Sequence, residues 1–477
     1  AVAVLRADAG EAEIVPTPVT PVPREIPAAL AASLARTGAG TMDIEDFYAL
    51  SPMQQGMLFH TLAEPDAVDY VEQFQCRLHG PLDPTRLRLA WQHTLDHQPV
   101  LRTGFHWAGL EQPLQVVQRG LELPWQQRDW SRGRDLEGRY RAFLAADRQQ
   151  GLTPERAPLM RLHLLDCGEH WRLVWTFHHL LLDGWCAGLV LQEVLTRYRA
   201  LATGTDPVLP PTRPYRDYIL WLQDRDMDRA EPFWRAELRD IQAPAPLPAQ
   251  LDDEPAGPPG EIPVPLPPGS DRILEAFCRR QRLTLASLLQ GAWAILLARH
   301  GGQSRVLFGT TVAGRPAELP GAETMVGLFI NTLPVAVSVD WRTPLAPWLR
   351  ALRDAQAERE AHAHTPLVKI QGWSGIPAGQ ALFHSLLVVE NLPDPGDTGE
   401  PLPFRVFHAG LRERSHYPLT LMANPGKRLA LYLKYDGKQC RPATVRRLAR
   451  QLATLLAAML AGADAPLGRL PLLDGDE

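Results

Sequence analysis

The sequence is poor in cysteine and has no cysteines paired at metal-binding spacing. Its 477 residues include only five cysteines, an odd number, and no C-x-x-C pair occurs. Widely scattered single thiols fit a reducing compartment better than a disulfide framework or a structural zinc site. The five positions are Cys76, Cys167, Cys186, Cys278 and Cys440. We therefore expect a cytoplasmic protein without a structural metal.

Charge of one sign and long apolar runs are also lacking. Lys and Arg number 49 against 54 Asp and Glu, a formal net charge of −5, and no basic stripe stands out. This balance disfavours nucleic acid as a partner. No apolar run approaches the length that spans a bilayer, and the first residues lack the basic start and apolar core of a signal peptide. The sequence predicts a soluble protein with no membrane partner.

Several catalytic motifs are missing. No Walker or Rossmann glycine pattern occurs, and the run Gly372-Trp373-Ser374-Gly375 fails the G-x-S-x-G serine-hydrolase motif at its last position. A zinc site at His178 and His179 is disfavoured, because adjacent strand residues diverge and no third ligand is placed nearby. Cys186 lies in an apolar turn, where a thiol is more often a small core residue than a nucleophile.

The most informative stretch is the run from Phe177 to Trp185, FHHLLLDGW. The residues before it alternate as in a strand, with Trp171, Leu173, Trp175 and Phe177 on one face. If that pleat continues, His178 and His179 point in opposite directions. After Gly184 the apolar residues follow helical spacing until Gly204, which is suited to end a helix. The pattern predicts a strand, a turn and a helix.

Two interpretations of the histidine pair remain open at this stage. Both rings can be packed core residues with satisfied hydrogen bonds. Alternatively, a loop at a strand end can hold one imidazole over a cleft, where it handles a proton in group transfer while a substrate supplies the nucleophile. Asp183 lies among apolar residues, so if buried it needs a cation or several hydrogen-bond donors.

The rest of the chain predicts a mixed α/β fold in two halves. Residues 1–42 are expected to form a proline-rich interdomain linker with one short helix, residues 43–210 an N-terminal lobe, and residues 211–477 a C-terminal lobe with crossover segments. Strands are predicted at 71–78, 100–105, 114–117, 160–167, 171–177, 305–310, 385–390 and 429–435. Helices are predicted from Ser51-Pro52, from Asp83-Pro84, at 184–204, around 215–238, from Ser270, from Thr284, from Thr343-Pro344 and from Pro442.

At this point the motifs resemble a known family. His178-His179-x-x-x-Asp183-Gly184 is similar to the HHxxxDG signature of condensation domains from non-ribosomal peptide synthetases. Further segments resemble the family's other motifs in the same order. They are Leu50 to His60, Leu101 to Phe105, Tyr215 to Tyr218, Gly314 to Pro316 with Met325 to Pro334, His364 to Leu367, and Arg414 to Leu419.

The resemblance implies two lobes similar to chloramphenicol acetyltransferase, arranged as a V-shaped pseudodimer with a central tunnel, with the donor side on the N-terminal lobe and the acceptor side on the C-terminal lobe. It implies an acyltransferase that forms an amide bond between two carrier-bound thioesters. Its partners would be upstream donor and downstream acceptor peptidyl carrier proteins, an adjacent adenylation domain and, as a further candidate, an upstream epimerization domain. No intrinsic cofactor is expected, because both substrates ride on 4′-phosphopantetheine of the carriers. We expect a monomer.

The resemblance also implies roles for individual residues. His179 would take a proton from the attacking amine or hold that amine in line, and the Gly184 N–H would donate to the developing oxyanion. His178 would support the loop. Asp183 would pair with Arg315 in a bidentate ion pair, with Arg102 as the second candidate partner.

The subtype and the alternatives follow from the same motifs. The first motif in its SPMQQGMLFH form, Ser51 to His60, together with DGWC at Asp183 to Cys186 resembles the class that joins a donor ending in a D-residue to an L-acceptor. Departures occur at Pro334-Val335-Ala336 and His416-Tyr417, where other residues are commoner in the family. The alternatives are an ester-forming or free-standing acyltransferase of the same fold and a catalytically silent recruitment module. A related epimerase would carry the sequence D-G-x-S-W at 183–187, whereas this chain has DGWCA there.

Overall fold

A computed structural model describes residues 25–473 except 39, 41–42, 65–67, 133–134, 242–246, 248–256, 378, 391–401, 413–416 and 426–428. The predicted proline-rich linker before residue 25 and Arg414 to His416 of the last motif lie outside these described residues. The chain divides into two compact units. Unit 1 comprises Ala1–Arg225, Arg315–Phe329 and Leu392–Arg414, and unit 2 comprises Asp226–Gly314, Ile330–Asn391 and Ser415–Glu477.

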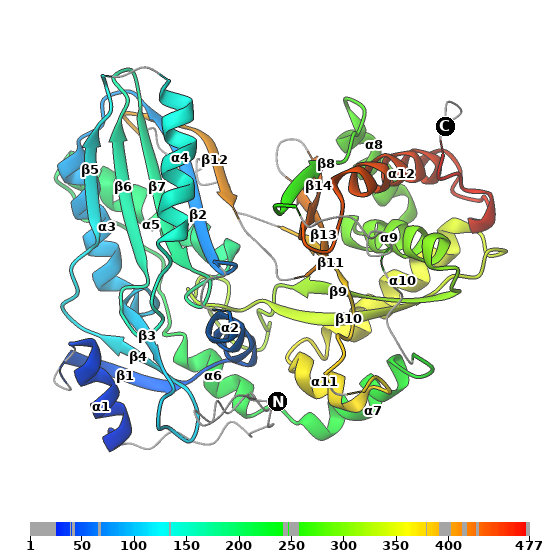
Figure 1. Ribbon diagram of the computed structural model, residues 1–477, viewed down its shortest axis with the longest axis horizontal. Helices are drawn as coiled ribbons and strands as arrows, with labels where there is room; N and C mark the ends of the chain where they lie inside the picture. The colour runs from blue at the N-terminus through cyan, green and yellow to red at the C-terminus, as the bar shows by residue number, and fades with distance from the viewer. Residues whose placement is uncertain are drawn as a thin grey trace. The chain divides into compact units, whose positions relative to one another are not determined.

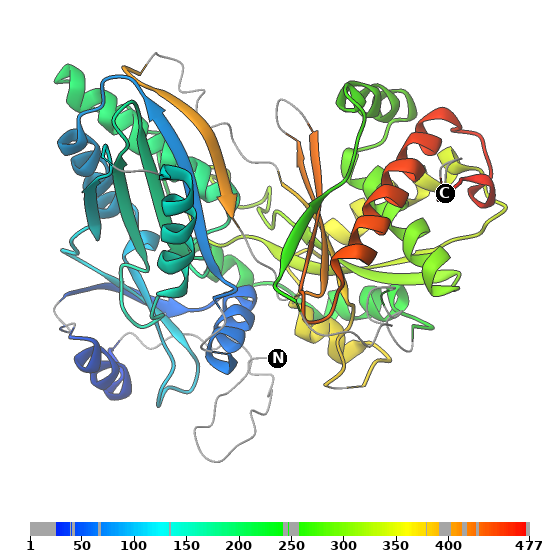
Figure 2. The ribbon, with the colours of Figure 1, turned by 45° about the horizontal axis from the view of Figure 1, so that its top comes forward.

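Unit 1 contains a mixed five-stranded sheet in the order β12-β2-β7-β6-β5, in which only β5 and β6 run parallel. Helices α3 and α5 lie on one face of this sheet and α4 on the other (Figure 1). The strands are β2 (Val71–His79), β5 (Trp125–Asp129), β6 (Met160–Asp166), β7 (Trp171–His178) and β12 (Arg405–Arg412). The helices are α3 (Pro84–His97), α4 (Leu136–Gln149) and α5 (Gly184–Thr203). Figure 2 shows β12 alongside β2 at the sheet edge.

The predicted alternation along β7 is confirmed. Trp175 packs against Trp91 of α3 with ring centroids 5.0 Å apart, whereas its neighbour Val174 belongs to the apolar cluster beneath α4. Because successive strand side chains point to opposite faces, β7 supplies both layers of unit 1. Both faces of the strand are buried, including the polar side chains of Arg172, Thr176 and His178.

A second, three-stranded sheet completes unit 1. Its order is β1-β4-β3, formed by β1 (Ile44–Ala49), β4 (Leu114–Gln118) and β3 (Thr103–His106). The short helix predicted near the N-terminus is α1 (Ala28–Thr37), which buries Leu30 and Leu34 against this sheet. The helix predicted from Ser51-Pro52 is α2 (Pro52–Ala63), and a capping box between Ser51 and Gln54 starts it.

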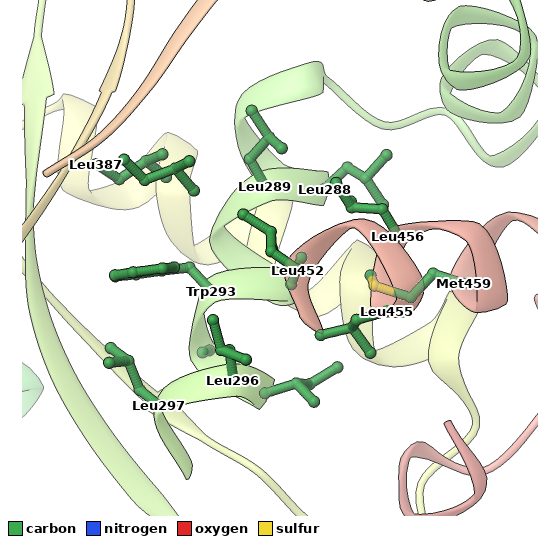
Figure 3. Close-up of a cluster of buried hydrophobic side chains, with 14 of the residues drawn as sticks. Leu288, Leu289, Trp293, Leu296, Leu297, Leu387, Leu452, Leu455, Leu456 and Met459 are labelled. Carbon is green, nitrogen blue, oxygen red and sulfur yellow. The ribbon is translucent and has the colours of Figure 1, made fainter. Parts of the chain in front are cut away.

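Unit 2 contains a six-stranded sheet in the order β10-β9-β11-β13-β14-β8. The strands are β8 (Gly260–Pro263), β9 (Arg305–Val312), β10 (Asn331–Ser338), β11 (Ser385–Val389), β13 (Leu419–Pro425) and β14 (Leu429–Tyr435). Its core joins α9 (Leu285–Gly301) and α12 (Pro442–Ala461), whose apolar side chains face each other in Figure 3. Further helices are α7 (Met227–Glu237), α8 (Ser270–Gln281), α10 (Leu345–Glu360) and α11 (Leu367–Trp373).

Three predicted elements need correction. Residues 100–105 are not one strand, because Pro99–Arg102 forms a 3₁₀ helix before β3. The helix expected around 215–238 is two helices, α6 (Arg216–Gln223) and α7, since Asp226 caps a new helix through the amide of Asp228. Thr343 does not cap α10; its hydroxyl donates to Asp340 instead, and the helix follows Pro344 without a side-chain cap.

The compact units also differ from the predicted lobes. Unit 1 continues to Arg225 rather than ending at 210, and it takes two later segments, Arg315–Phe329 and Leu392–Arg414, from the half assigned to the C-terminal lobe. Crossover segments are expected in the C-terminal lobe, but the amino-acid composition of these two segments does not mark them as such. Within the described residues, the structure contains no helix with the length and apolar character required to cross a membrane.

Asp147 of α4 anchors that helix to the sheet through a buried hydrogen-bond network. The Asp147 carboxylate accepts from Arg161 Nε at 2.6 Å, from His163 Nε2 at 3.0 Å and from Gln73 Nε2 at 2.7 Å. Thr176 also donates to it. Burial alone raises the pKa of Asp147, but the hydrogen bonds from His163, Arg161 and Thr176 outweigh burial and bring the pKa below its usual value.

We predict that Asp147→Ala lowers the free energy of unfolding by about 3–5 kcal/mol at pH 7, because it leaves Arg161 buried without its partner. Since the folded-state pKa of Asp147 is depressed, its contribution is present above the ordinary pKa of 3.8 and is lost as the pH falls below it. Urea unfolding of wild type, Asp147→Ala and Asp147→Asn between pH 7 and pH 3.5 measures both the loss at pH 7 and its pH dependence. The stability difference should be constant down to about pH 5 and shrink below pH 4; a difference independent of pH would contradict the assignment.

Candidate active site

The histidine loop connects the end of β7 to the start of α5. The backbone amide of His178 donates to Leu159 O at 3.0 Å, and that of His179 donates to Tyr70 O at 2.8 Å. Leu181 N closes a tight turn onto His178 O at 3.0 Å. Both histidines therefore sit on backbone that is hydrogen-bonded to neighbouring segments, as the strand, turn and helix pattern predicts.

His178 is buried and supports the turn. Its Nδ1 accepts from the Leu180 N–H at 3.1 Å, so in the neutral ring the proton lies on Nε2, which faces Thr61 Oγ1 at 3.5 Å. Burial, and secondarily the neighbouring His179, lower the pKa of His178 to about 3. The ring thus stays neutral near pH 7, and both nitrogens are engaged within the fold.

His179 is half-buried and has a different hydrogen-bond arrangement. Its Nδ1 lies 2.9 Å from the backbone carbonyl of Leu182. A carbonyl oxygen can only accept, so Nδ1 carries the proton, and in the neutral ring Nε2 keeps its lone pair. This is the tautomer that a base or hydrogen-bond acceptor acting through Nε2 requires.

Asp183 is the N-cap of α5 and is bound mainly by backbone amides. Its carboxylate accepts from Cys186 N at 2.9 Å and from Phe329 N at 3.0 Å. Arg315 Nη2 lies 3.9 Å from Asp183 Oδ1, which is an ion pair without a hydrogen bond. Arg315 is therefore the ion-pair partner of Asp183 as predicted, but the bidentate geometry is wrong, because the Arg315 donors bind Ala322 O, Met325 O and Cys186 Sγ instead.

Arg315 binds the segment that follows it in the chain. Its Nη1 donates to the carbonyls of Ala322 and Met325, and its Nη2 donates to Cys186 Sγ at 2.8 Å. The guanidinium also lies over the Phe329 ring, 4.1 Å from its centroid. Arg315 thus fastens the segment 315–329 to the first turn of α5.

Arg102, the second candidate partner for Asp183, lies elsewhere. Its Nη1 donates to Glu45 Oε2 at 2.6 Å and to Gln118 O at 2.5 Å, and its Nε donates to Leu95 O at 3.0 Å. These contacts join α3 to β1 and β4. The prediction that Arg102 could pair with Asp183 is wrong.

Gly184 is the first residue of α5. The first amides of a helix have no acceptor within the helix and carry partial positive charge. Two amides of this turn bind within the protein, Cys186 N to the Asp183 carboxylate and Ala187 N to Asp183 O. The role of Gly184 N–H as oxyanion donor stays a proposal.

Three supporting residues were missed or only partly recognised in the sequence. Gln54, identified as half of a capping box, also donates from Nε2 to Leu180 O at 3.0 Å in the histidine turn. Tyr215 donates to Leu328 O at 2.5 Å, and Cys186 binds Arg315. Gln54 and Tyr215 lie in motifs noted in the sequence, but no spacing rule links those motifs to the turn.

No group of three or more His, Cys, Asp or Glu residues placed to hold a metal occurs in the part of the chain that the structure describes. In that same part the five cysteines are free.

The family model of the condensation domain matches residues 44–477. The chain belongs to the condensation-domain family. Condensation domains of non-ribosomal peptide synthetases are acyltransferases that form amide bonds, and they use carrier-bound substrates. The mixed α/β fold agrees with the predicted class.

Curated relatives are parts of peptide synthetases. The chain is 38% identical over 445 residues to one of the linear gramicidin synthase subunits of Brevibacillus parabrevis, covering 91% of this chain and 9% of that protein. It is 34% identical over 507 residues to chondramide synthase cmdD of Chondromyces crocatus, covering 96% of this chain and 13% of that protein. The condensation domain therefore spans only a small part of the relatives it matches.

Solved condensation domains share the fold. The starter condensation domain of rhizomide synthetase gives a TM-score of 0.77 at 21% identity, covering 94% of this chain and 100% of that one. The first condensation domain of the calcium-dependent antibiotic synthetase gives 0.76 at 18% identity, covering 91% and 100%. A four-domain non-ribosomal peptide synthetase gives 0.76 at 18% identity, covering 91% of this chain and 34% of that one.

We predict that His179→Ala lowers the single-turnover rate of condensation by about 10²- to 10⁴-fold, because it removes the Nε2 lone pair. The unfolding transition should move little, since His179 is only half-buried. A matched control is His93→Ala, a half-buried histidine of α3, which should keep the wild-type rate. A His179→Ala rate within about twofold of wild type would contradict a direct role.

Proposed function

We propose that this condensation domain forms a peptide bond between a carrier-bound peptidyl or aminoacyl thioester donor and a carrier-bound L-aminoacyl acceptor. The acceptor amine attacks the donor carbonyl, the C–N bond forms, and the C–S bond of the donor thioester breaks. The released thiolate takes a proton, and the acceptor arm carries the lengthened chain. Both thioesters would belong to 4′-phosphopantetheine of carrier proteins, so the chain's own residues only position the reactants and move the proton.

The observation that carries this proposal is the Nδ1-protonated His179. Its free Nε2 can accept the proton that the amine loses on attack, or hold the amine through a hydrogen bond. The Gly184 N–H at the start of α5 would donate to the oxyanion that forms when the amine attacks. His178, Asp183 and Arg315 would hold the turn without touching the reacting atoms.

We further propose that the donor ends in a D-residue. The support is the motif pair Ser51-Pro52-Met53-Gln54 and Asp183-Gly184-Trp185-Cys186, which resembles the D-donor class. The structure links the two motifs, since Gln54 Nε2 donates to Leu180 O in the turn that precedes Asp183. Starter condensation domains occur among the structural neighbours. Their sequences are 21% identical to this chain, so the likeness supports the shared fold and says nothing about the donor.

The proposed partners are an upstream donor carrier and a downstream acceptor carrier, with an adenylation domain and an upstream epimerization domain as neighbours in a longer synthetase. The relatives support this arrangement, because the chain spans 9% of a linear gramicidin synthase subunit and about a third of a four-domain synthetase.

The test is a single-turnover assay with two carriers, one loaded with a dipeptidyl thioester ending in a D- or L-residue and the other with an L-aminoacyl thioester. Mass spectrometry of the acceptor arm reports transfer. We expect a condensed product, formed faster from the D-donor by about tenfold or more, a discrimination that contacts in one pocket can supply.

Equal rates from both donors would overturn the stereochemical proposal and leave the reaction standing. No product from either donor, with both carriers still bound, would overturn the reaction. An ester-forming or free-standing acyltransferase would then be tested by replacing the acceptor with a hydroxyacyl thioester or a free amine.

A further inference from the structure

The sulfur of Cys186 lies at the centre of a buried contact between α5 and the segment 315–329. Arg315 Nη2 donates to it at 2.8 Å, and Gly327 N donates to it at 3.2 Å. The thiol itself faces Met325 O at 3.7 Å. Burial raises the pKa of Cys186 well above its usual value, so the residue is a neutral thiol that accepts two hydrogen bonds and points its proton at a carbonyl.

The neighbours of Cys186 bind the same segment. Phe329 N donates to the Asp183 carboxylate at 3.0 Å, and Trp185 Nε1 donates to Glu323 O at 3.2 Å. Residues 183–186 therefore bind residues 323–329 through side-chain and backbone hydrogen bonds. The Cys186 sulfur is the atom of α5 that accepts a hydrogen bond from the Arg315 side chain, whose guanidinium also lies 5.8 Å from the centroid of the Trp185 ring.

Gly327 connects this sulfur to the 182–183 peptide through two separate peptide groups, one on each side of its Cα. Gly327, whose N–H donates to Cys186, accepts from Asp183 N at 3.4 Å. Asp183 N and Leu182 O belong to one planar peptide group, and Leu182 O accepts from His179 Nδ1 at 2.9 Å. The peptide that fixes the His179 tautomer is thus held from its other side by Gly327.

The sulfur also keeps Arg315 from the Asp183 carboxylate. Arg315 Nη2 lies 3.9 Å from Asp183 Oδ1 and bonds to Cys186 instead. Without that acceptor, the guanidinium can approach the carboxylate and compete with the amides of Cys186 and Phe329, because a charge-assisted bond to a carboxylate is stronger than one to sulfur. Movement of Arg315 toward Asp183, or loss of the hydrogen bond from Gly327 N to the sulfur, would displace the 182–183 peptide that holds His179.

We propose that Cys186 is a positioning residue for the condensation reaction, because its sulfur holds Arg315 and Gly327 in the places that keep the 182–183 peptide against His179 Nδ1. The kinetic part of this inference rests on the proposed function. The residue does not touch the substrates.

The test compares Cys186→Ala, Cys186→Ser and Cys76→Ala. Cys76 is a matched control, since it is another buried cysteine of unit 1, on β2 and away from the turn. We expect Cys186→Ala to lower the rate constant at saturating carriers by about 10- to 100-fold, as misplacement of a catalytic group does, with KM nearly unchanged. Cys186→Ser should recover most of the rate because its hydroxyl oxygen also accepts, whereas Cys76→Ala should keep the wild-type rate.

Arg315 provides a second kinetic test. If Cys186 acts through Arg315, the rate losses of Cys186→Ala and Arg315→Met should not add in the double variant. Additive losses would overturn that part of the inference. So would a Cys186→Ser variant as slow as Cys186→Ala, or a Cys186→Ala variant as fast as Cys76→Ala.

Hydrogen exchange provides a readout that does not depend on activity. The Cys186→Ala variant should exchange the amides of Asp183, Gly327 and Phe329 faster than wild type, while Cys186→Ser and Cys76→Ala should not. An inactive wild type would overturn the proposed function, and exchange would still decide the inference. Unchanged exchange in Cys186→Ala would overturn the inference even if the wild type condenses its substrates.

Discussion

The carboxylate of Asp183 is the constraint on which the rest of the site depends. It is buried, and it accepts one amide from its own helix, Cys186 N, and one from a distant segment, Phe329 N. A buried carboxylate without such donors would be costly, so the amides of α5 and of the segment ending at Phe329 together stabilise Asp183 in its buried position. His178 ends β7, and the turn that begins with His179 connects the strand to this fixed point.

The surroundings of the two adjacent histidines place the ring proton on different nitrogens, Nε2 in His178 and Nδ1 in His179. His178 accepts from Leu180 N and is kept neutral by burial, which lowers its pKa to about 3. His179 donates to Leu182 O and retains a lone pair on Nε2. Both nitrogens of His178 therefore face partners within the fold, whereas Nε2 of His179 remains a hydrogen-bond acceptor. The difference comes from the geometry of the turn, since the two residues are of the same type.

Much of the fold follows from local patterns, whereas the site depends on contacts that local patterns do not encode. Alternation identified β7, and the Ser51 cap identified α2. Charge identified Arg315 as the ion-pair partner of Asp183, but its bidentate geometry was wrong. The amide of Phe329, 146 residues away, binds the carboxylate instead and is invisible in the sequence. Arg102 failed for the same reason, since Glu45 and two carbonyls already occupy its guanidinium.

The central claim is that the 182–183 peptide fixes His179 with its proton on Nδ1. It is tested most directly by ¹⁵N NMR of histidine-labelled protein, with the His179 signals identified by comparison with His179→Ala. The account predicts that in the neutral ring Nδ1 carries the proton and Nε2 does not. A protonated Nε2 with a free Nδ1 would contradict it, because Nε2 could then neither accept the amine proton nor hold the amine.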